Sequence, residues 1–164
     1  MSWIRQKWRA LLDRMVREKA PSSFIARGWA IGMFYGCTIP FGFQLILSVP
    51  TAVFMRGSKV GAVFGTFITN HFTIFVIYPV QCWLGNRLMG GSLSYDAICE
   101  AMKSVVREQS WSSLLQLGGE LTGAFFVGGF AIAAVLVPLT YFGVKRYVEF
   151  HRARREVAKT DGDE

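Results

Sequence analysis

The chain has 164 residues, of which 52% are hydrophobic and 18% are charged, and its net charge is +7 at pH 7. Residues 28–55, 60–86 and 121–144 contain no Asp, Glu, Lys or Arg. Each stretch reaches or exceeds the ~20 residues that a helix needs to cross a bilayer. A soluble protein would have to bury three such helices with almost no polar face. The sequence therefore predicts an all-α integral membrane protein.

The positive charge is concentrated near the two ends. Seven Lys and Arg lie within residues 5–27 and six within residues 145–159. Because both segments adjoin hydrophobic stretches, we expect them to contact anionic lipid headgroups, and no motif argues for nucleic acid. The three cysteines have no CxxC or CxxH spacing, so we expect no zinc site and no other cofactor.

Residues 1–20 carry apolar side chains at steps of three and four positions, including Trp3 and Trp8. The arginines of this segment mostly fall on other faces. This pattern predicts a basic amphipathic helix that lies on the membrane surface. A helix that binds a partner protein is the alternative.

A membrane domain should follow over residues 21–145, beginning with a broken helix over residues 24–56. Pro40 lacks an amide hydrogen and Gly42 is conformationally permissive, so the helix should break at residues 39–42. Small residues repeat every four positions on one face of this segment, which lets membrane helices approach closely. They are Gly28, Gly32 and Gly36.

The second hydrophobic stretch predicts another broken helix, over residues 60–88. Its polar interruption is Thr69, Asn70 and His71, and we expect Thr69 or Asn70 to cap a helix that begins at His71. Shifting this stretch by 29 positions aligns six identical residues with the first one, which is typical of duplicated membrane segments. A second stripe of small residues is Gly57, Gly61 and Gly65, and we expect the two stripes to pack helices within a homo-oligomer.

The remaining residues predict three more segments. Residues 94–116 are amphipathic and should form an interfacial helix, and residues 120–144 should form an unbroken transmembrane helix. Residues 146–164 should be a basic to polar cytoplasmic tail with frayed structure.

The charge distribution also predicts the orientation. Thirteen of the 18 Lys and Arg flank the first and last hydrophobic stretches, so both ends should be cytoplasmic and the number of crossings even. The third stretch can cross only once, so one of the first two must cross and the other must return. We favour the first stretch as a return loop that turns at Pro40.

The two breaks are the candidate binding site. A break in a membrane helix exposes backbone groups that lipid cannot satisfy, and the helix that follows presents a partly positive N-terminus. With Arg27 or Arg56 nearby, two such ends could hold a phosphate or another anion. The alternative is that the breaks only let two short helices turn and pack. The candidate substrate-binding residues are Arg27, Pro40, Gly42, Gln44, Thr69, Asn70, His71 and Thr73.

No enzyme is expected, because the chain has no G-x-S-x-G elbow, no HExxH and no phosphate-binding P-loop. The stretches PSSFIARGWAIGMFYGCTIPFGFQ and GTFITNHFTIFVIYPVQCWLG resemble a bacterial membrane family known as domain of unknown function 2062. The resemblance covers roughly residues 20–145. In that family a proline usually follows the asparagine that corresponds to Asn70, and this chain has His71 at that position. The matching positions are Pro21, Ala30, Gly32, Pro40, Gly42, Gln44, Gly65, Thr66, Asn70, Thr73, Pro79 and Gly85.

Similar domains are sometimes joined to glycosyltransferases that use lipid-linked sugars, which implies a role with a polyprenyl phosphate or a phospholipid. We therefore expect a multi-pass protein of the bacterial inner membrane. It would bind, and could translocate, an anionic lipid or a polyprenyl-phosphate-linked substrate at the paired breaks, acting within a homo-oligomer or with a membrane protein partner. The alternative is a non-transporting scaffold that docks a membrane enzyme through Trp3, Trp8 and Tyr95.

Overall fold

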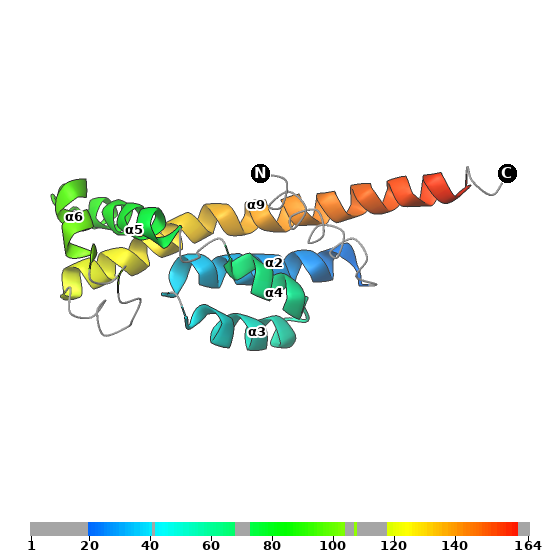
Figure 1. The fold of residues 1–164 in the computed structure, drawn as a ribbon, viewed down its shortest axis with the longest axis horizontal. Coiled ribbons are helices and arrows are strands. Elements are labelled where there is room, and N and C mark those ends of the chain that lie inside the picture. The colour runs from blue at the N-terminus through cyan, green and yellow to red at the C-terminus, as the bar shows by residue number, and fades with distance from the viewer. Residues whose placement is uncertain (1–19, 41, 68–72, 104–106, 108–117, 161–164) are drawn as a thin grey trace.

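The computed structural model of the protein describes residues 20–40, 42–67, 73–103, 107 and 118–160, with side chains as far as residue 154. These residues form helices and no strand, as the sequence predicts (Figure 1). The expected surface helix over residues 1–20 lies almost wholly outside the described residues. The helices are α2 (Ser22–Thr38), α3 (Gln44–Phe54), α4 (Lys59–Thr66), α5 (Ile74–Leu88), α6 (Tyr95–Ala101) and α9 (Gly119–Thr160).

The long helix α9 is the axis along which the other helices lie (Figure 1). Its 42 residues correspond to about 63 Å. Among the described residues it is the one helix long and apolar enough to cross a membrane. Only 22% of its most apolar window is buried, whereas the core helix of a soluble protein would be mostly buried.

Helix α9 does not end near Val144, where we expected a frayed tail to begin, but continues to Thr160. The beginning of α2 packs on this extension. Ile25 is buried against Val148, and the Nη1 group of Arg152 donates a hydrogen bond of 2.9 Å to the carbonyl of Ala20. These contacts between distant segments support helical structure that the local sequence does not require.

The first break lies where the sequence predicts it. Pro40 disfavours helical backbone at the residue before it, and Ile39 is indeed extended, with φ −113° and ψ 134°. Gly42 has φ +101°, which favours glycine. The chain then reverses, so that α3 runs back along α2: Tyr35 contacts Thr51.

Gln44 holds this break together. Its side chain is 3% exposed. Its Nε2 group donates to the carbonyl of Ile39 at 2.8 Å and to that of Gly36 at 3.4 Å. The last carbonyls of a helix have no partner within the helix. Gln44 therefore satisfies the end of α2 from within the chain.

The two glycine stripes contact each other within one chain. A Cβ atom on Gly28 would clash with the carbonyl of Ser58, and one on Gly32 with the carbonyl of Ala62. From α4, a Cβ on Gly61 would meet the side chain of Trp29 at 2.7 Å. Helices α2 and α4 therefore run parallel at backbone contact, a closeness that small residues allow. Gly57 and Gly65 of the second stripe also lie here, since they adjoin Gly28 and Gly32.

Helix α5 runs antiparallel to α9. A Cβ on Gly85 would clash with the carbonyl of Ala124, and one on Gly128 with that of Gln81. Since α2 is also antiparallel to α9 and α4 is parallel to α2, helices α4 and α5 point the same way. The first hydrophobic stretch thus reverses direction, and the second does not.

Helix α5 begins at Ile74, and not at His71 as predicted from its expected cap. The polar residues of the second break, Thr69, Asn70 and His71, lie outside the described residues. The expected interfacial helix over residues 94–116 is described as α6, which is capped by the Ser94 hydroxyl accepting from the amide of Ala97. Most of the segment beyond residue 103 lies outside the described part of the chain.

Replacing Gly32 with alanine should destabilise the fold by about 1–3 kcal/mol, because the added methyl group meets the Ala62 backbone. The measurement is the thermal unfolding midpoint of the protein in detergent. Gly143→Ala is the matched control, since a Cβ there meets nothing within 4 Å. Equal midpoints for both variants would contradict the packing described above.

Replacing Gln44 with leucine should cost about 1–3 kcal/mol, because two carbonyls at the end of α2 lose their donor. Hydrogen exchange across residues 36–44 should increase. Thr38→Val is the control, since the Thr38 hydroxyl donates to the carbonyl of Phe34 in its own helix and does not reach across the break. The role of Gln44 in the break is refuted if exchange there rises no more than in the control.

Candidate functional site: an arginine-rimmed groove

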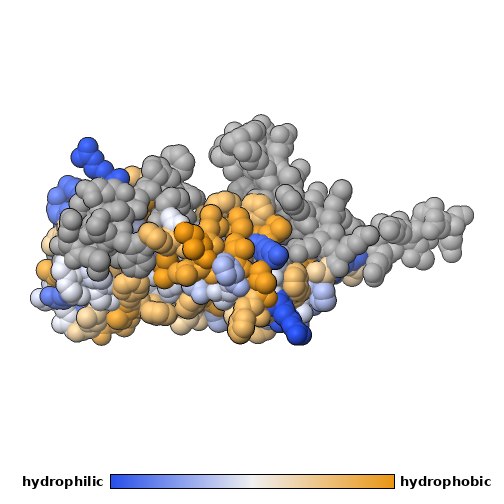
Figure 2. Space-filling model, turned by 90° about the horizontal axis from the view of Figure 1, so that it is seen from below, coloured by the Kyte–Doolittle hydropathy of each residue, from blue (hydrophilic) through white to orange (hydrophobic). Residues whose placement is uncertain are grey.

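The middle of the molecule exposes large apolar side chains on several helices, and Figure 2 shows such a surface over the face on which α3 lies. Phe54 is 89% exposed, and Ile46, Val76 and Phe142 are more than 60% exposed. An apolar surface of this extent indicates contact with lipid or with another apolar partner.

The charged residues lie at the two ends of this apolar surface, and the ends differ. The end formed by the start of α2, the α3–α4 turn and residues 145–154 is strongly basic. Its described cations are Arg27, Arg56, Lys59, Lys145, Arg146, Arg152 and Arg154, and its one described acid is Glu149. The opposite end mixes both signs, with Arg87, Lys103 and Arg107 beside Asp96, Glu100 and Glu120.

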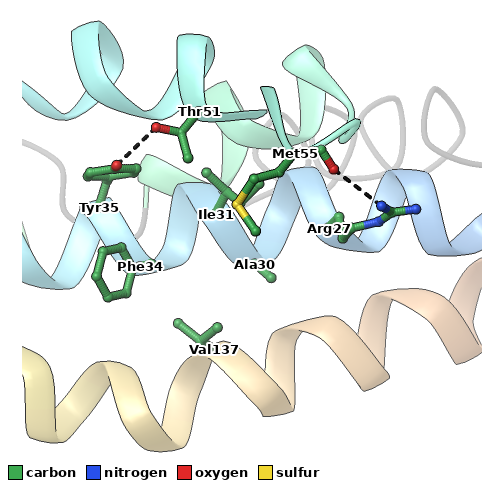
Figure 3. Close-up of a pocket in the computed structure, with 8 residues that line it drawn as sticks. All are labelled: Arg27, Ala30, Ile31, Phe34, Tyr35, Thr51, Met55 and Val137. Atoms are coloured by element: carbon green, nitrogen blue, oxygen red, sulfur yellow. Dashed lines mark hydrogen bonds between the residues drawn. The ribbon is translucent and has the colours of Figure 1, made fainter. Parts of the chain in front are cut away.

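A groove of about 400 Å³ opens between α2, α3 and α9 (Figure 3). Its walls are mostly apolar, and its polar groups lie at its two ends. Arg27 lies at the basic end, and Tyr35 on α2 and Thr51 on α3 lie further along the groove. The other lining residues are Ala30, Ile31, Phe34, Met55 and Val137.

Arg27 lies at the border between the basic end and the apolar surface. Ile25, two residues earlier, packs on Val148, which is just beyond the charge-free stretch of α9. The Nη1 group of Arg27 donates to the carbonyl of Met55 at 3.2 Å, and its Nε group donates to that of Ser23 at 3.4 Å. A guanidinium has five N–H donors, so these bonds leave donors available for an anion.

The polar atoms at the other end of the groove are satisfied within the protein. The Tyr35 hydroxyl and Thr51 Oγ1 are 2.9 Å apart, and Thr51 Oγ1 donates to the carbonyl of Leu47 at 2.8 Å. A threonine hydroxyl has one hydrogen, so Tyr35 is the donor of the first bond. Arg27 is thus the side chain of this groove that has donors to offer a ligand.

The structure does not bring Arg27 together with the first break. Arg27 and Thr38 are separated by eleven residues of α2, or about 17 Å. At the break, Pro40 is buried, Gly42 is exposed and the Gln44 amide donates to the end of α2. The expected phosphate site that combined Arg27 or Arg56 with the paired breaks is therefore not assembled at the first break.

The residues expected at the second break are mostly outside the described part of the chain. Thr73 is described and half-buried, directly before α5. Arg56, the alternative cation, is exposed in the turn between α3 and α4, with φ +51°. This turn lies at the basic end beside Arg27, since Arg27 donates to the preceding residue, Met55.

The sequence analysis missed Gln81, a fully buried amide on α5. Its Nε2 group donates to the carbonyl of Phe125 on α9 at 2.8 Å, and its Oε1 has no partner among the described residues. An interhelical amide bond of this kind holds membrane helices together. The sequence could have indicated it, because Gln81, like Asn70, is an uncharged polar residue within the charge-free stretch of residues 60–86.

Comparisons with known proteins identify the chain at the level of its family. A search of curated proteins found no match, and a search of solved structures found none either. Residues 5–156 match a family model described as "Uncharacterized protein conserved in bacteria (DUF2062)". This match extends the resemblance noted in the sequence at both ends. The chain belongs to this bacterial family.

Proposed function

We propose that this protein binds an anionic lipid of the bacterial inner membrane, with the phosphate at Arg27 and an acyl or prenyl chain in the groove beside it. The observation that carries the proposal is the groove itself: apolar along its length, with a guanidinium at the end nearest the other cations. Its volume of about 400 Å³ falls within the range of small-molecule sites, ~300–1,000 Å³.

The chemistry of each part fits one part of such a lipid. Arginine binds phosphate oxygens through parallel N–H donors, and the bond is strengthened by charge. Alanine, isoleucine, phenylalanine and valine side chains offer a hydrocarbon chain nothing but apolar contact. The surrounding cations attract anionic lipid, and each Lys or Arg near the surface contributes about 1 kcal/mol to that attraction.

We also propose that both ends of the chain lie in the cytoplasm and that the chain crosses the membrane twice. Ala20 and Arg152 are hydrogen-bonded to each other at the basic end, which supports a common side for both. Basic residues favour the cytoplasmic side. In this arrangement α2 and α3 form a return loop, α4 and α5 cross together, and α9 crosses back.

Cysteine labelling tests this topology. In a Cys99→Ser background, Arg87→Cys should react with a membrane-impermeant maleimide in intact cells, because Arg87 is exposed at the end proposed to face outward. Arg56→Cys should react only after the cells are opened. Cys37 and Cys82 are buried and should not react with the maleimide. Labelling of Arg56→Cys in intact cells would refute the proposed orientation.

Replacing Arg27 with glutamine should weaken binding of phosphatidylglycerol by about 1.5–3 kcal/mol, the contribution of a hydrogen bond to a charged group. Native mass spectrometry of the purified protein, titrated with phosphatidylglycerol against a phosphatidylcholine background, measures the change. Arg87→Gln is the matched control, because it removes an exposed arginine at the opposite end.

A second pair of variants tests the groove without changing charge. Val137 lines the groove, so Val137→Trp should fill it and reduce lipid binding. Val135 lies on the same helix and is 60% exposed, so Val135→Trp should not. If neither Arg27→Gln nor Val137→Trp reduces lipid binding relative to its control, the groove is not a lipid site. Co-purification of a partner protein would in that case favour the scaffold alternative.

A further inference from the structure

We infer that the preferred lipid carries two phosphates, one held at Arg27 and the other at Arg56 and Lys59, with its chains on both sides of α3. This inference rests on the proposed function and names the lipid class for the same site. Its starting observation is a second groove at the basic end, of about 610 Å³. That groove is lined by Phe24, Val53, Arg56, Gly57, Lys59 and Val60.

The two grooves flank the end of α3. Thr51 and Met55 line the first groove, and Val53 lines the second. Two residues along a helix correspond to about 200° of rotation, so Val53 faces away from the other two. The last turn of α3 therefore separates two grooves that each have apolar walls and a cationic rim.

The two rims are adjacent because the α3–α4 turn packs on α2. A Cβ on Gly57 would lie 3.3 Å from the Cβ of Arg27 and 3.0 Å from the amide nitrogen of Gly28. The amide of Ser58 donates to the carbonyl of Phe24 at 3.0 Å, which fixes the turn there. Arg56 directly precedes this anchored pair, and the Met55 carbonyl that is bonded to its amide nitrogen accepts a hydrogen bond from Arg27, so the backbone of Arg56 lies next to the Arg27 guanidinium.

These cations have no acidic partner within the described residues. The one ion pair found there joins Lys103 to Glu100 at the opposite end, and Glu149, the described acid of the basic end, accepts a hydrogen bond from Ser22. A lipid with one phosphodiester would pair with Arg27 and leave Arg56 and Lys59 without an anion. A lipid with two phosphates supplies one anion to Arg27 and another to Arg56 and Lys59.

The chains distinguish the class of diphosphate lipid. A prenyl diphosphate has adjacent phosphates and a single chain, which would fill one groove. A diphosphatidylglycerol has two phosphates joined by a glycerol, each with its own pair of chains. That lipid can place chains in both grooves while its headgroup bridges the α3–α4 turn, so the geometry points to it.

Native mass spectrometry with diphosphatidylglycerol and phosphatidylglycerol, titrated separately, tests the inference. One diphosphatidylglycerol should bind more tightly than phosphatidylglycerol and should displace it. The double variant Arg56→Gln/Lys59→Gln should weaken diphosphatidylglycerol binding by about fivefold per cation, or roughly 25-fold together. Binding of one phosphatidylglycerol at Arg27 should fall by a smaller factor, because its single phosphate loses only the long-range attraction of these two cations and no direct contact.

The controls separate charge, folding and the two proposals. Arg87→Gln/Lys103→Gln removes two exposed cations at the other end and should change neither affinity. The exchange Arg56→Lys/Lys59→Arg keeps the charge and should retain diphosphatidylglycerol. If the double glutamine variant leaves the ratio of the two affinities unchanged, the inference is wrong, even where Arg27→Gln still weakens both lipids. If Arg27→Gln weakens the binding of neither lipid, the proposed function itself is wrong.

Discussion

The contact on which the rest of the structure depends is the glycine-lined approach of α2 and α4. Because Gly28 and Gly32 have no side chains, the backbone of Ser58 and Ala62 can lie directly against α2. This contact fixes the α3–α4 turn beside the first turns of α2, with the Ser58 amide bonded to Phe24. The positions of Arg27 and Arg56, and both grooves, follow from it.

The same contact explains why two similar stretches of sequence take different paths. Each has a glycine stripe, an interruption and an apolar helix with an internal proline. Helix α3 folds back because α2 and α4 leave a place for it, where Ala52 is fully buried against Ile31 and Ala62. Helix α5 instead packs on the start of α9, where Tyr78 and Phe125 meet edge to face with ring centroids 5.0 Å apart. A local pattern sets where a helix breaks, and packing sets where the next helix goes.

Polar groups within the apolar region are mostly bonded to the backbone, whereas Arg27, Arg56 and Lys59 at the basic end form no ion pair within the described residues. Gln44 donates to the end of α2, Gln81 to α9, and Tyr35 to Thr51. Since water is scarce in hydrocarbon, such pairing is what an apolar environment requires. Seven of the described Lys and Arg are gathered at one end, which faces the phosphates of the cytoplasmic leaflet in the proposed orientation.

The sequence by itself determined the features that depend on local chemistry: the all-helical class, the family, the break that Pro40 and Gly42 impose after Thr38, and the long apolar helix that begins near residue 120. Only the tertiary structure decided that the glycine stripes pair within one chain, that α9 continues to Thr160 and that Arg27 lies about 17 Å from the break it was expected to serve. It also revealed the buried bond of Gln81. These outcomes depend on contacts between residues as far apart as Ala20 and Arg152, and residue spacing within a helix carries no information about which distant helix will pack against it.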